Sequence, residues 1–337
     1  MIRTPVLQIL NKGGVDILPR LTGLWVSCKV SETAGQESDT AEIVCVRTAA
    51  SVLPTRGDEF TILGGWLDEG PVDQGRFTVQ KITLSGSGSS DGDMFSVQLR
   101  AADYVDKLKG HASKHYDDTT YGKVVEDIAK QCGLDASVDA DIAKVQIPYA
   151  LRWEQSHIDF LTHLSGEVGA VCKPAGGKLI AVKRGGGKSA SGKDLSPILI
   201  SRPICMGYDL EIEPRPETGD IAAAWHDEKT GKRKIVKHKT GRKGPVAHIP
   251  HPYRSEDEAK KAAEADAFER GNDSASGDFR CIGLPEAHAE APVIVRGFGS
   301  VIDGRWKAES IEKIWGDDGF TTTVGVKSGE DQKGDKK

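Results

Sequence analysis

Two pairs of histidines have a spacing that could bind a metal ion. His111 and His115 lie four residues apart, as in a zinc-binding helix, but Ala112 stands where that motif carries a glutamate. His248 and His251 flank a proline in a segment expected to be extended. A structural zinc site needs four ligands, and no nearby cysteine or carboxylate pattern supplies the others. We therefore predict no metal site.

The segment Gly187-Lys188-Ser189 resembles the end of a phosphate-binding loop. Such a loop requires a glycine five positions before its final glycine, where this chain has Val182. No periodic helix follows that could hold a phosphate at its N-terminus. The stretch from Gly185 to Gly192 therefore fits a flexible loop, and we predict no cofactor-binding residue.

No pattern of residues predicts a catalytic centre. The sequence lacks the G-x-S-x-G turn of a nucleophilic serine. Asp58 and Asp220 each follow a turn glycine, where an aspartate usually bonds its own turn backbone. The cysteines form no C-x-x-C pair and are expected to be small buried hydrophobic residues, namely Cys28, Cys45, Cys132, Cys172, Cys205 and Cys281. We predict that the chain is not an enzyme.

A basic stretch runs from Glu228 through Lys234 to Arg242-Lys243. One interpretation is a solvated hairpin loop, and the other is contact with an acidic partner surface. The net charge of −5 over 337 residues gives no reason to expect sequence-specific binding of nucleic acid. No apolar run is long enough for a membrane span or a signal peptide, so we expect synthesis in a cytosol without membrane insertion.

The length predicts two or three domains, with apolar residues at 38% and charged residues at 28%. Residues 1–110 show the alternation of short β-strands, for example at Val26, Cys28 and Val30, as in a barrel or sandwich. The alternation slips by one residue after Val79, which predicts a β-bulge near Lys81. The Gly/Ser-rich run from Ser85 to Asp93 is expected to be a hairpin loop.

Residues 111–205 predict a small α/β domain. One helix is expected after Thr119 or Thr120 and ends at Gly133, and a second covers Glu154 to Val168. Strands are expected at 170–173 and 178–183. This segment would separate the two ends of the chain.

Residues 206–326 return to a β pattern, with strands expected at 219–225, 293–298, 306–315 and 320–326. A capping box of Ser255 and Glu258 begins a helix over 255–270, which we interpret as an insertion in this β domain. The polar residues 327–337 are expected to form a disordered tail.

The two β regions share short patterns. Pro54-x-x-Gly57-Asp58 has a counterpart at Pro216-x-x-Gly219-Asp220, and Gly75-Arg76-Phe77 has one at Gly304-Arg305-Trp306. Strands that begin near Phe95 and Phe320 follow. These matches indicate either a structural duplication or a turn that is common before strands, and both readings stay open.

The order of several motifs resembles the late control protein D family, the baseplate hubs of contractile phage tails. It is also similar to the N-terminal hub region of type VI secretion spike proteins. The stretches that carry the resemblance are Leu21-Thr-Gly-Leu24, Glu37-Ser-Asp39, Gly75-Arg-Phe77, Ala101-Ala-Asp103 with Leu108-Lys109, the helix 119–134, Trp153 to Ala170, Gly219-Asp220 to Asp227, and Gly319-Phe-Thr-Thr-Thr323.

This resemblance implies an α+β, mainly β fold. It implies two similar tube-forming β-barrel domains, with the small α/β domain between them and the helix inserted in the second barrel. It also implies a homotrimer in the tail baseplate of the virion, assembled in the host cytoplasm. Its partners would be the tail spike protein, the tail tube or tube-initiator protein and the tape-measure protein. A trimer of two-barrel chains would adapt the six-fold tail tube to a three-fold spike.

Two other functions are alternatives. A hub-associated cell-wall hydrolase would need a further domain with paired carboxylates or a metal, and no stretch is left over to hold one. A carbohydrate- or host-binding module would display aromatic side chains in its loops, whereas the six tryptophans mostly fall in or beside predicted strands.

Overall fold

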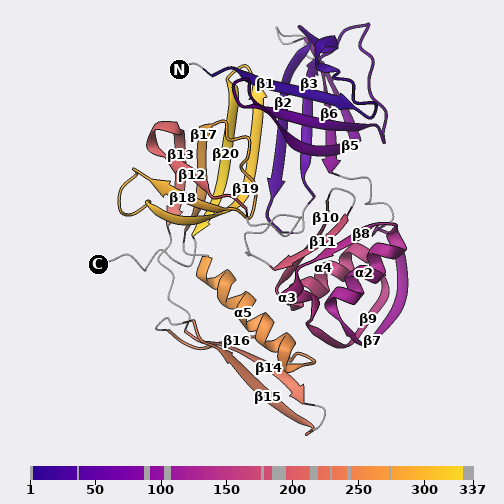
Figure 1. The fold of residues 1–337 in the computed structure, drawn as a ribbon, viewed down its shortest axis with the longest axis vertical. Helices are drawn as coiled ribbons and strands as arrows, with labels where there is room; N and C mark the ends of the chain where they lie inside the picture. Colours follow the sequence, from indigo (N-terminus) through magenta and orange to yellow (C-terminus); the bar gives the residue numbers. More distant parts are fainter. Residues whose placement is uncertain are drawn as a thin grey trace.

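The computed structural model describes residues 3–35, 38–86, 92–101, 108–175, 178–183, 195–212, 219–227, 230–240, 244–272 and 275–328. Figure 1 shows four units. A first β unit and a second β unit lie side by side, an α/β unit lies beside them, and a helix with a small sheet forms the opposite end. The chain is therefore mainly β with a minority of helix, as predicted.

The first β unit contains six antiparallel strands, in the order β1-β4-β5-β6-β3-β2. Alternating side chains of these strands are buried in one core, which includes Ile9, Ile43, Phe77 and Val97. The short helix η1 (Leu18–Leu21) follows β1. The strands are β1 (Pro5–Asn11), β2 (Trp25–Thr33), β3 (Thr40–Val46), β4 (Glu59–Trp66), β5 (Gly70–Gly86) and β6 (Asp93–Ala101).

The second β unit repeats this arrangement with six strands in the order β12-β18-β19-β20-β17-β13. In chain order, each strand takes the place of its counterpart in the first β unit. One orientation differs, because β12 pairs with β18 in parallel whereas β1 pairs with β4 antiparallel. The strands are β12 (Ile198–Ser201), β13 (Cys205–Ile212), β17 (Ala275–Ile282), β18 (Pro292–Arg296), β19 (Gly304–Gly316) and β20 (Gly319–Ser328), and the 3-10 helix η2 (Arg202–Ile204) precedes β13.

Two β-bulges fall at the same places in both β units. The β5–β6 register shifts between Val79 and Lys81, as the sequence predicted, and the β19–β20 register shifts between Ala308 and Ser310. Both shifts lie four to six residues after Gly75 and Gly304, which begin the two Gly-Arg-aromatic motifs. Because a bulge changes the face of every later side chain, its repetition supports a structural duplication.

A second pair of bulges fixes the remaining register. β2 shifts against β3 between Trp25 and Ser27, and β13 shifts against β17 between Cys205 and Gly207. Trp25 is opposite Cys45, and Cys205 is opposite Cys281. The structural duplication is therefore supported by the strand order and by both pairs of bulges.

Two of the motif equivalences predicted between the β regions are wrong. The counterpart of β4 is β18, whereas β14 (Ile221–Asp227), which follows Gly219-Asp220, belongs to a different sheet. Phe95 is opposite Leu84 and Phe320 is opposite Trp315, so these two phenylalanines occupy different register positions. The turn motif was misleading because a turn before a strand is a local feature that recurs in unrelated places.

Backbone pairing between β2 and β19 joins the two β units into one sheet. β2 pairs antiparallel with β19 from Cys28 opposite Trp315 to Thr33 opposite Ser310. All twelve strands are thereby joined by backbone pairing. The long β19 makes this possible, since its first half pairs with β18 and its second half pairs with β2.

The α/β unit has its own core of helices packed against short sheets. Val124, Val125 and Ile128 are buried on α2, and Gly133 ends that helix in a left-handed conformation with φ of 70°. The unit contains β7 (His111–Thr120), α2 (Tyr121–Cys132), β8 (Asp135–Val138), α3 (Ala140–Ala143), β9 (Gln146–Ser156), α4 (His157–Glu167), β10 (Ala170–Ala175) and β11 (Lys178–Lys183).

Two boundaries of this unit differ from the prediction. Helix α4 starts after Ser156, whose hydroxyl accepts a hydrogen bond from the backbone N–H of Asp159, and Glu154 lies in β9. The predicted α/β domain extended to residue 205, but Ile198, Ile200 and Cys205 are buried in the core of the second β unit. β12 therefore belongs to that unit.

Tyr121→Phe is expected to lower the free energy of unfolding of the α/β unit by about 1–2 kcal/mol. The Tyr121 hydroxyl lies 2.6 Å from the Ser165 hydroxyl in the core, so its removal leaves the serine hydroxyl without this partner. Urea denaturation with hydrogen exchange on α2 and α4 measures the change. Tyr149→Phe is the matched control, because Tyr149 is exposed and its hydroxyl contacts His115 at the surface. Equal losses in both variants would contradict this account.

The insertion unit consists of β14, β15 (Lys232–His238), β16 (Ala247–His248) and helix α5 (Glu256–Asn272). Ala259, Ala263 and Ala267 of the helix pack on Ile221 and Ala223 of β14. The inserted segment is therefore larger than the predicted helix 255–270, and the strand expected at 219–225 is part of it. The alanine face of a helix needs an apolar sheet to cover it, and β14 supplies that surface.

The predicted capping box is present at the start of α5. The backbone N–H of Glu258 donates to the Ser255 hydroxyl over 3.2 Å, as predicted. The Glu258 carboxylate is bonded by the backbone N–H of Ser255, as predicted, and also accepts from the backbone N–H of Arg254 over 3.1 Å.

Other predictions concern segments outside the described residues, including Gly187-Lys188-Ser189, Pro216 and most of the loop 85–93. The predicted tail began at residue 327, but β20 extends to Ser328, and residues 329–337 are outside the description. Among the described helices, none has the length and apolar character needed to cross a membrane.

Candidate functional site: the junction of the two β units

The structure does not bring the candidate metal ligands together. His111 and His115 lie on strand β7, where residues four apart are not stacked as they are on a helix, and His115 Nδ1 is 3.0 Å from the Tyr149 hydroxyl. His248 ends the short strand β16, and His251 follows it. Within the described ranges, no group of three His, Cys, Asp or Glu side chains could hold a metal ion.

The turn aspartate and the cysteines behave as predicted. The Asp58 carboxylate accepts from the backbone N–H and the hydroxyl of Thr55, over 2.7 and 3.0 Å, and so bonds its own turn. Asp220 immediately precedes β14. All six cysteines are buried free thiols. Part of the basic stretch, Lys232 to His238, forms strand β15, where Lys234 pairs with Asp227 over 2.5 Å.

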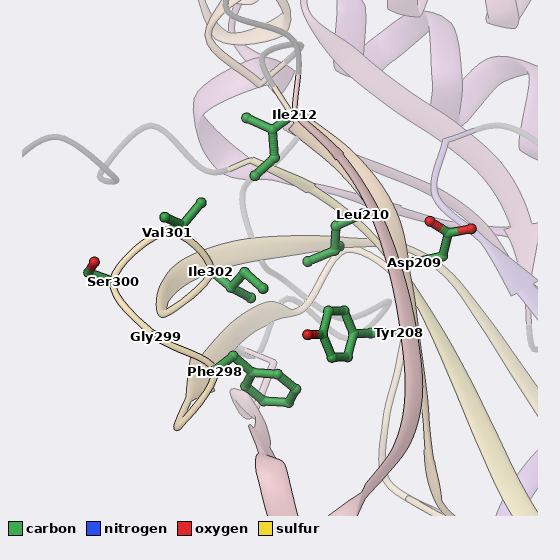
Figure 2. Close-up of a pocket in the computed structure, with 9 residues that line it drawn as sticks. All are labelled: Tyr208, Asp209, Leu210, Ile212, Phe298, Gly299, Ser300, Val301 and Ile302. Carbon is green, nitrogen blue, oxygen red and sulfur yellow. The ribbon is translucent and has the colours of Figure 1, made fainter.

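Two hollows of the described surface are large enough to be tested as binding sites. One, of about 750 Å³, lies in the first β unit and has apolar walls that include Leu21, Ile43 and Phe95. Its acidic residues have local partners, since Asp58 bonds Thr55 and Glu59 lies 3.4 Å from Lys12. The second, of about 530 Å³, lies between β13 and the loop 298–302 (Figure 2). Neither contains the pair of facing carboxylates that hydrolysis of a glycosidic bond requires.

The end of the β19–β20 hairpin packs into the core of the first β unit. Trp315 and Phe320 stack with ring centroids 4.4 Å apart and an interplanar angle of 7°, and Phe320 also contacts Trp66 at 5.3 Å. The Trp315 ring lies so close to Gly64 of β4 that a Cβ at this position would overlap it. The Trp66 indole N–H donates to the Gly283 carbonyl over 2.9 Å. The core of the first β unit is therefore completed by side chains from the second.

A buried charge cluster lies at the same junction. The Lys313 ammonium of β19 donates to Gln74 Oε1 over 2.7 Å and to the Pro285 carbonyl over 2.9 Å, and it lies 3.5 Å from the Glu32 carboxylate of β2. Glu32 also contacts His288 Nδ1 at 3.1 Å. Because a buried charge is costly unless it is paired, these contacts favour one arrangement of the two units.

The pKa values of this cluster reflect burial and charge together. Burial alone would raise the pKa of Glu32, but hydrogen bonding from His288 and the charge of Lys313 outweigh it and lower the pKa to about 2. Burial lowers the pKa of Lys313 below its ordinary value, while Glu32 opposes the shift. The cluster acts as a structural ion pair, with donors and acceptors satisfied inside the protein.

Salt bridges link the α/β unit to the first β unit and to the insertion unit. Lys173 of β10 lies 3.5 Å from Asp39 beside β3, and Lys183 of β11 lies 2.6 Å from Glu264 of α5. Arg254 pairs with Glu167 of α4 and donates to the Tyr149 carbonyl over 2.6 Å. The junction residues were not identified from the sequence, since Lys313 and Glu32 look like ordinary exposed charges in alternating strands.

Comparison with known sequences gives relatives over nearly the whole chain. The chain is 26% identical to a probable baseplate hub protein of Escherichia phage 186, covering 93% of this chain and 90% of the relative. It is 27% identical to a probable baseplate hub protein of Escherichia phage P2, covering 92% of this chain and 89% of the relative. No family model matches the chain.

Comparison with solved structures supports the fold. A 43 kDa tail protein from prophage MuSo2 of Shewanella oneidensis matches 96% of this chain and 98% of its own length, with a TM-score of 0.68 and 12% identity. A tail protein from Neisseria meningitidis matches 96% of this chain and 97% of its own length, with a TM-score of 0.67 and 13% identity. The E. coli c3393 protein, a component of the type VI secretion system, matches 91% of this chain and 74% of its own length, with a TM-score of 0.56 and 10% identity.

At these identities the structural matches establish the fold, and the sequence matches show the similarity to probable baseplate hub proteins. Together they confirm the resemblance to the baseplate hub proteins of contractile phage tails.

Proposed function

We propose that the chain is a structural baseplate hub of a contractile phage tail or a related injection particle. In this proposal it acts as a homotrimer in the virion, assembled in the host cytoplasm, and adapts a six-fold tail tube to a three-fold spike. The observation that carries the proposal is the repeated strand order of the two β units. Three chains with two alike units each can present six alike surfaces around an axis.

The junction supports a role in transmitting force. The two β units share a continuous sheet, and Trp315 and Phe320 of the second unit pack in the core of the first, so a load on one unit passes to the other through backbone hydrogen bonds and packed aromatic rings. The buried Glu32–Lys313 pair fixes their relative arrangement. A rigid two-unit body suits an adaptor better than a pair of domains on a flexible linker would.

The proposed partners are the tail spike protein on one face and the tail tube or tube-initiator protein on the other, with the tape-measure protein in the lumen. Catalysis is not part of the proposal. The tryptophans do not form the exposed loop cluster that a carbohydrate-binding role would need, since Trp66, Trp306 and Trp315 are buried in the two β cores and the exposed Trp153 lies on strand β9.

The mass of the native particle tests the proposal. Native mass spectrometry of the chain, alone and co-expressed with its cognate spike protein, is expected to give three hub chains, about 109 kDa or three times 36.2 kDa, per spike trimer. A chain that stays monomeric in both preparations would contradict the proposal, as would hydrolysis of cell-wall polymer by the purified chain.

A further inference from the structure

Among the strand edges left unpaired in the described part of the chain, two lie on β13 and on the second half of β5. β13 is the last strand of the twelve-stranded sheet and pairs with β17 on one side alone. β5 pairs with β4 as far as Thr78, while its second half, from Lys81 to Gly86, pairs with β6 alone. Free edges offer unpaired N–H and C=O groups, and natural proteins usually protect them.

The internal duplication relates these two edges to the junction. The shared bulges align Lys81–Gly86 of β5 with Ser310–Trp315 of β19, and Tyr208–Ile212 of β13 with Cys28–Glu32 of β2. These counterparts, β19 and β2, are the strands that pair with each other inside the chain. The free edge of β13 is therefore equivalent to β2, and the free edge of β5 is equivalent to β19, the two strands that pair at the junction.

Several side chains on the free edges are apolar and exposed, whereas the residues at the equivalent positions of the β2–β19 junction are buried. Leu84 is 50% exposed, whereas its counterpart Lys313 is fully buried. Tyr208 is 47% exposed, whereas its counterpart Cys28 is fully buried. Ile212 is also exposed, at 48%. Exposed apolar side chains along an unpaired edge indicate a protein contact surface.

The hollow beside β13 in the second β unit corresponds in position to the site that the end of the β19–β20 hairpin occupies in the first β unit. There Trp315 lies against Gly64 of β4, and the pairing of β18 with β19 makes Gly297 the counterpart of Gly64. Phe298 follows Gly297 and lines the hollow of about 530 Å³. Figure 2 shows Tyr208 and Leu210 turned toward the loop 298–302, with Asp209 on the other side of the strand.

The charges of the two edges are compatible. In the junction, Lys29 of β2 lies 3.5 Å from Glu312 of β19 in a diagonal pair across the strands. On the free edges, Glu211 of β13 would lie diagonally from Lys81 of β5, again with opposite signs. Diagonal neighbours on one face of a sheet are close enough for long side chains to meet.

We propose that β13 of one chain pairs antiparallel with the second half of β5 of a second copy of this chain. The register places Tyr208 opposite Gly86, Leu210 opposite Leu84 and Ile212 opposite Ile82. The contact repeats head to tail, which is the geometry that closes a ring. This inference rests on the proposed homotrimer and adds the surfaces that form it.

Disulfide trapping tests the register. The double variant Glu211→Cys with Thr83→Cys places two thiols directly opposite each other between chains, within the Cα separation that a disulfide spans. After oxidation by copper phenanthroline, non-reducing gels are expected to show most of the chain as a covalent trimer that dithiothreitol returns to monomer. Each single variant, and Glu211→Cys with Ser85→Cys two residues out of register, are expected to stay largely monomeric.

An internal control uses the same chemistry within one chain. Ser31 and Glu312 are opposite each other in the junction, so Ser31→Cys with Glu312→Cys is expected to form an intramolecular disulfide under the same conditions. Suppose that the control disulfide forms and the protein has the mass of a trimer, but the variant with cysteines at 83 and 211 gives no cross-link. The proposed interface is then wrong, while the hub proposal stands. A chain that remains monomeric by native mass contradicts both. Equal cross-linking in the register-shifted variant also overturns the interface.

Discussion

Trp315→Ala is expected to destabilise the joint between the two β units by about 3–5 kcal/mol, in the range for removal of a large buried aromatic residue. Trp315 is 1% exposed, stacks on Phe320 and covers Gly64, so the variant leaves a cavity in the core of the first β unit. Of the described buried polar atoms, its indole Nε1 is one without a hydrogen-bond partner. The loss is therefore one of packing, which an aliphatic replacement would recover in part.

Urea denaturation followed by tryptophan fluorescence, with hydrogen exchange on the β2 and β19 amides, measures this loss. Trp153→Ala is the matched control, because that tryptophan is 64% exposed on β9 and its removal is expected to change the free energy of unfolding by no more than about 0.5 kcal/mol. Unchanged exchange of β2 and β19 in Trp315→Ala would show that the hairpin end does not hold the two units together.

Glu32→Gln is expected to lower the free energy of unfolding at pH 7 by about 3 kcal/mol, the linkage value for a pKa lowered from 4.5 to about 2. The Glu32 side chain is 13% exposed and has a pKa near 2, well below its ordinary value of 4.5. The neutral amide keeps the shape of the side chain but leaves the buried Lys313 ammonium without its anion.

The pH dependence has a definite sign. Because the pKa of Glu32 is lower in the folded than in the unfolded chain, its stabilisation is fully present above about pH 4.5 and is lost as the pH falls toward 2. The difference between wild type and Glu32→Gln should therefore be largest at neutral pH and shrink through this window. Denaturation at several pH values from 7 to 2.5 measures it.

Glu309→Gln is the control for the charge itself. Glu309 is also on β19 but pairs with Lys327 at the surface, where an ion pair contributes between about 0 and 1 kcal/mol. If the two glutamine variants had equal effects, or if the Glu32→Gln difference persisted unchanged at pH 2.5, the buried cluster would not stabilise the junction.

Local patterns were enough to predict most of the individual elements. Alternating apolar residues identified β2 and β6, the slip after Val79 identified a bulge, and Gly133 marked the end of α2. These features depend on neighbours within a few residues, which is the range over which side-chain period and capping operate.

Long-range pairing could not be predicted in the same way. The strands β13 and β17 are adjacent in the sheet, but the insertion unit separates Ile212 from Ala275 in the sequence. In the first β unit the equivalent connection runs only from Thr33 to Thr40. Because of this difference, the turn near Gly219 was mistaken for the counterpart of the turn near Gly57.

The junction itself has no local signal. Lys313 and Glu32 become a buried pair only because β19 extends beyond β18 to meet β2, 281 positions away along the chain by the difference of their residue numbers. A lysine in an alternating strand normally faces solvent. The Gly-Arg-aromatic motifs at Gly75 and Gly304 did identify equivalent strands, since both precede the bulge that sets the later register.

The central claim is that two alike β units in each chain let three chains imitate six-fold symmetry. End-on class averages of the native particle by electron cryomicroscopy test it directly. We expect a ring of six similar lobes around a lumen, with three peripheral densities for the α/β and insertion units. A ring with three unlike sectors, or a particle in which the two β units of each chain lie at different radii, would contradict the claim.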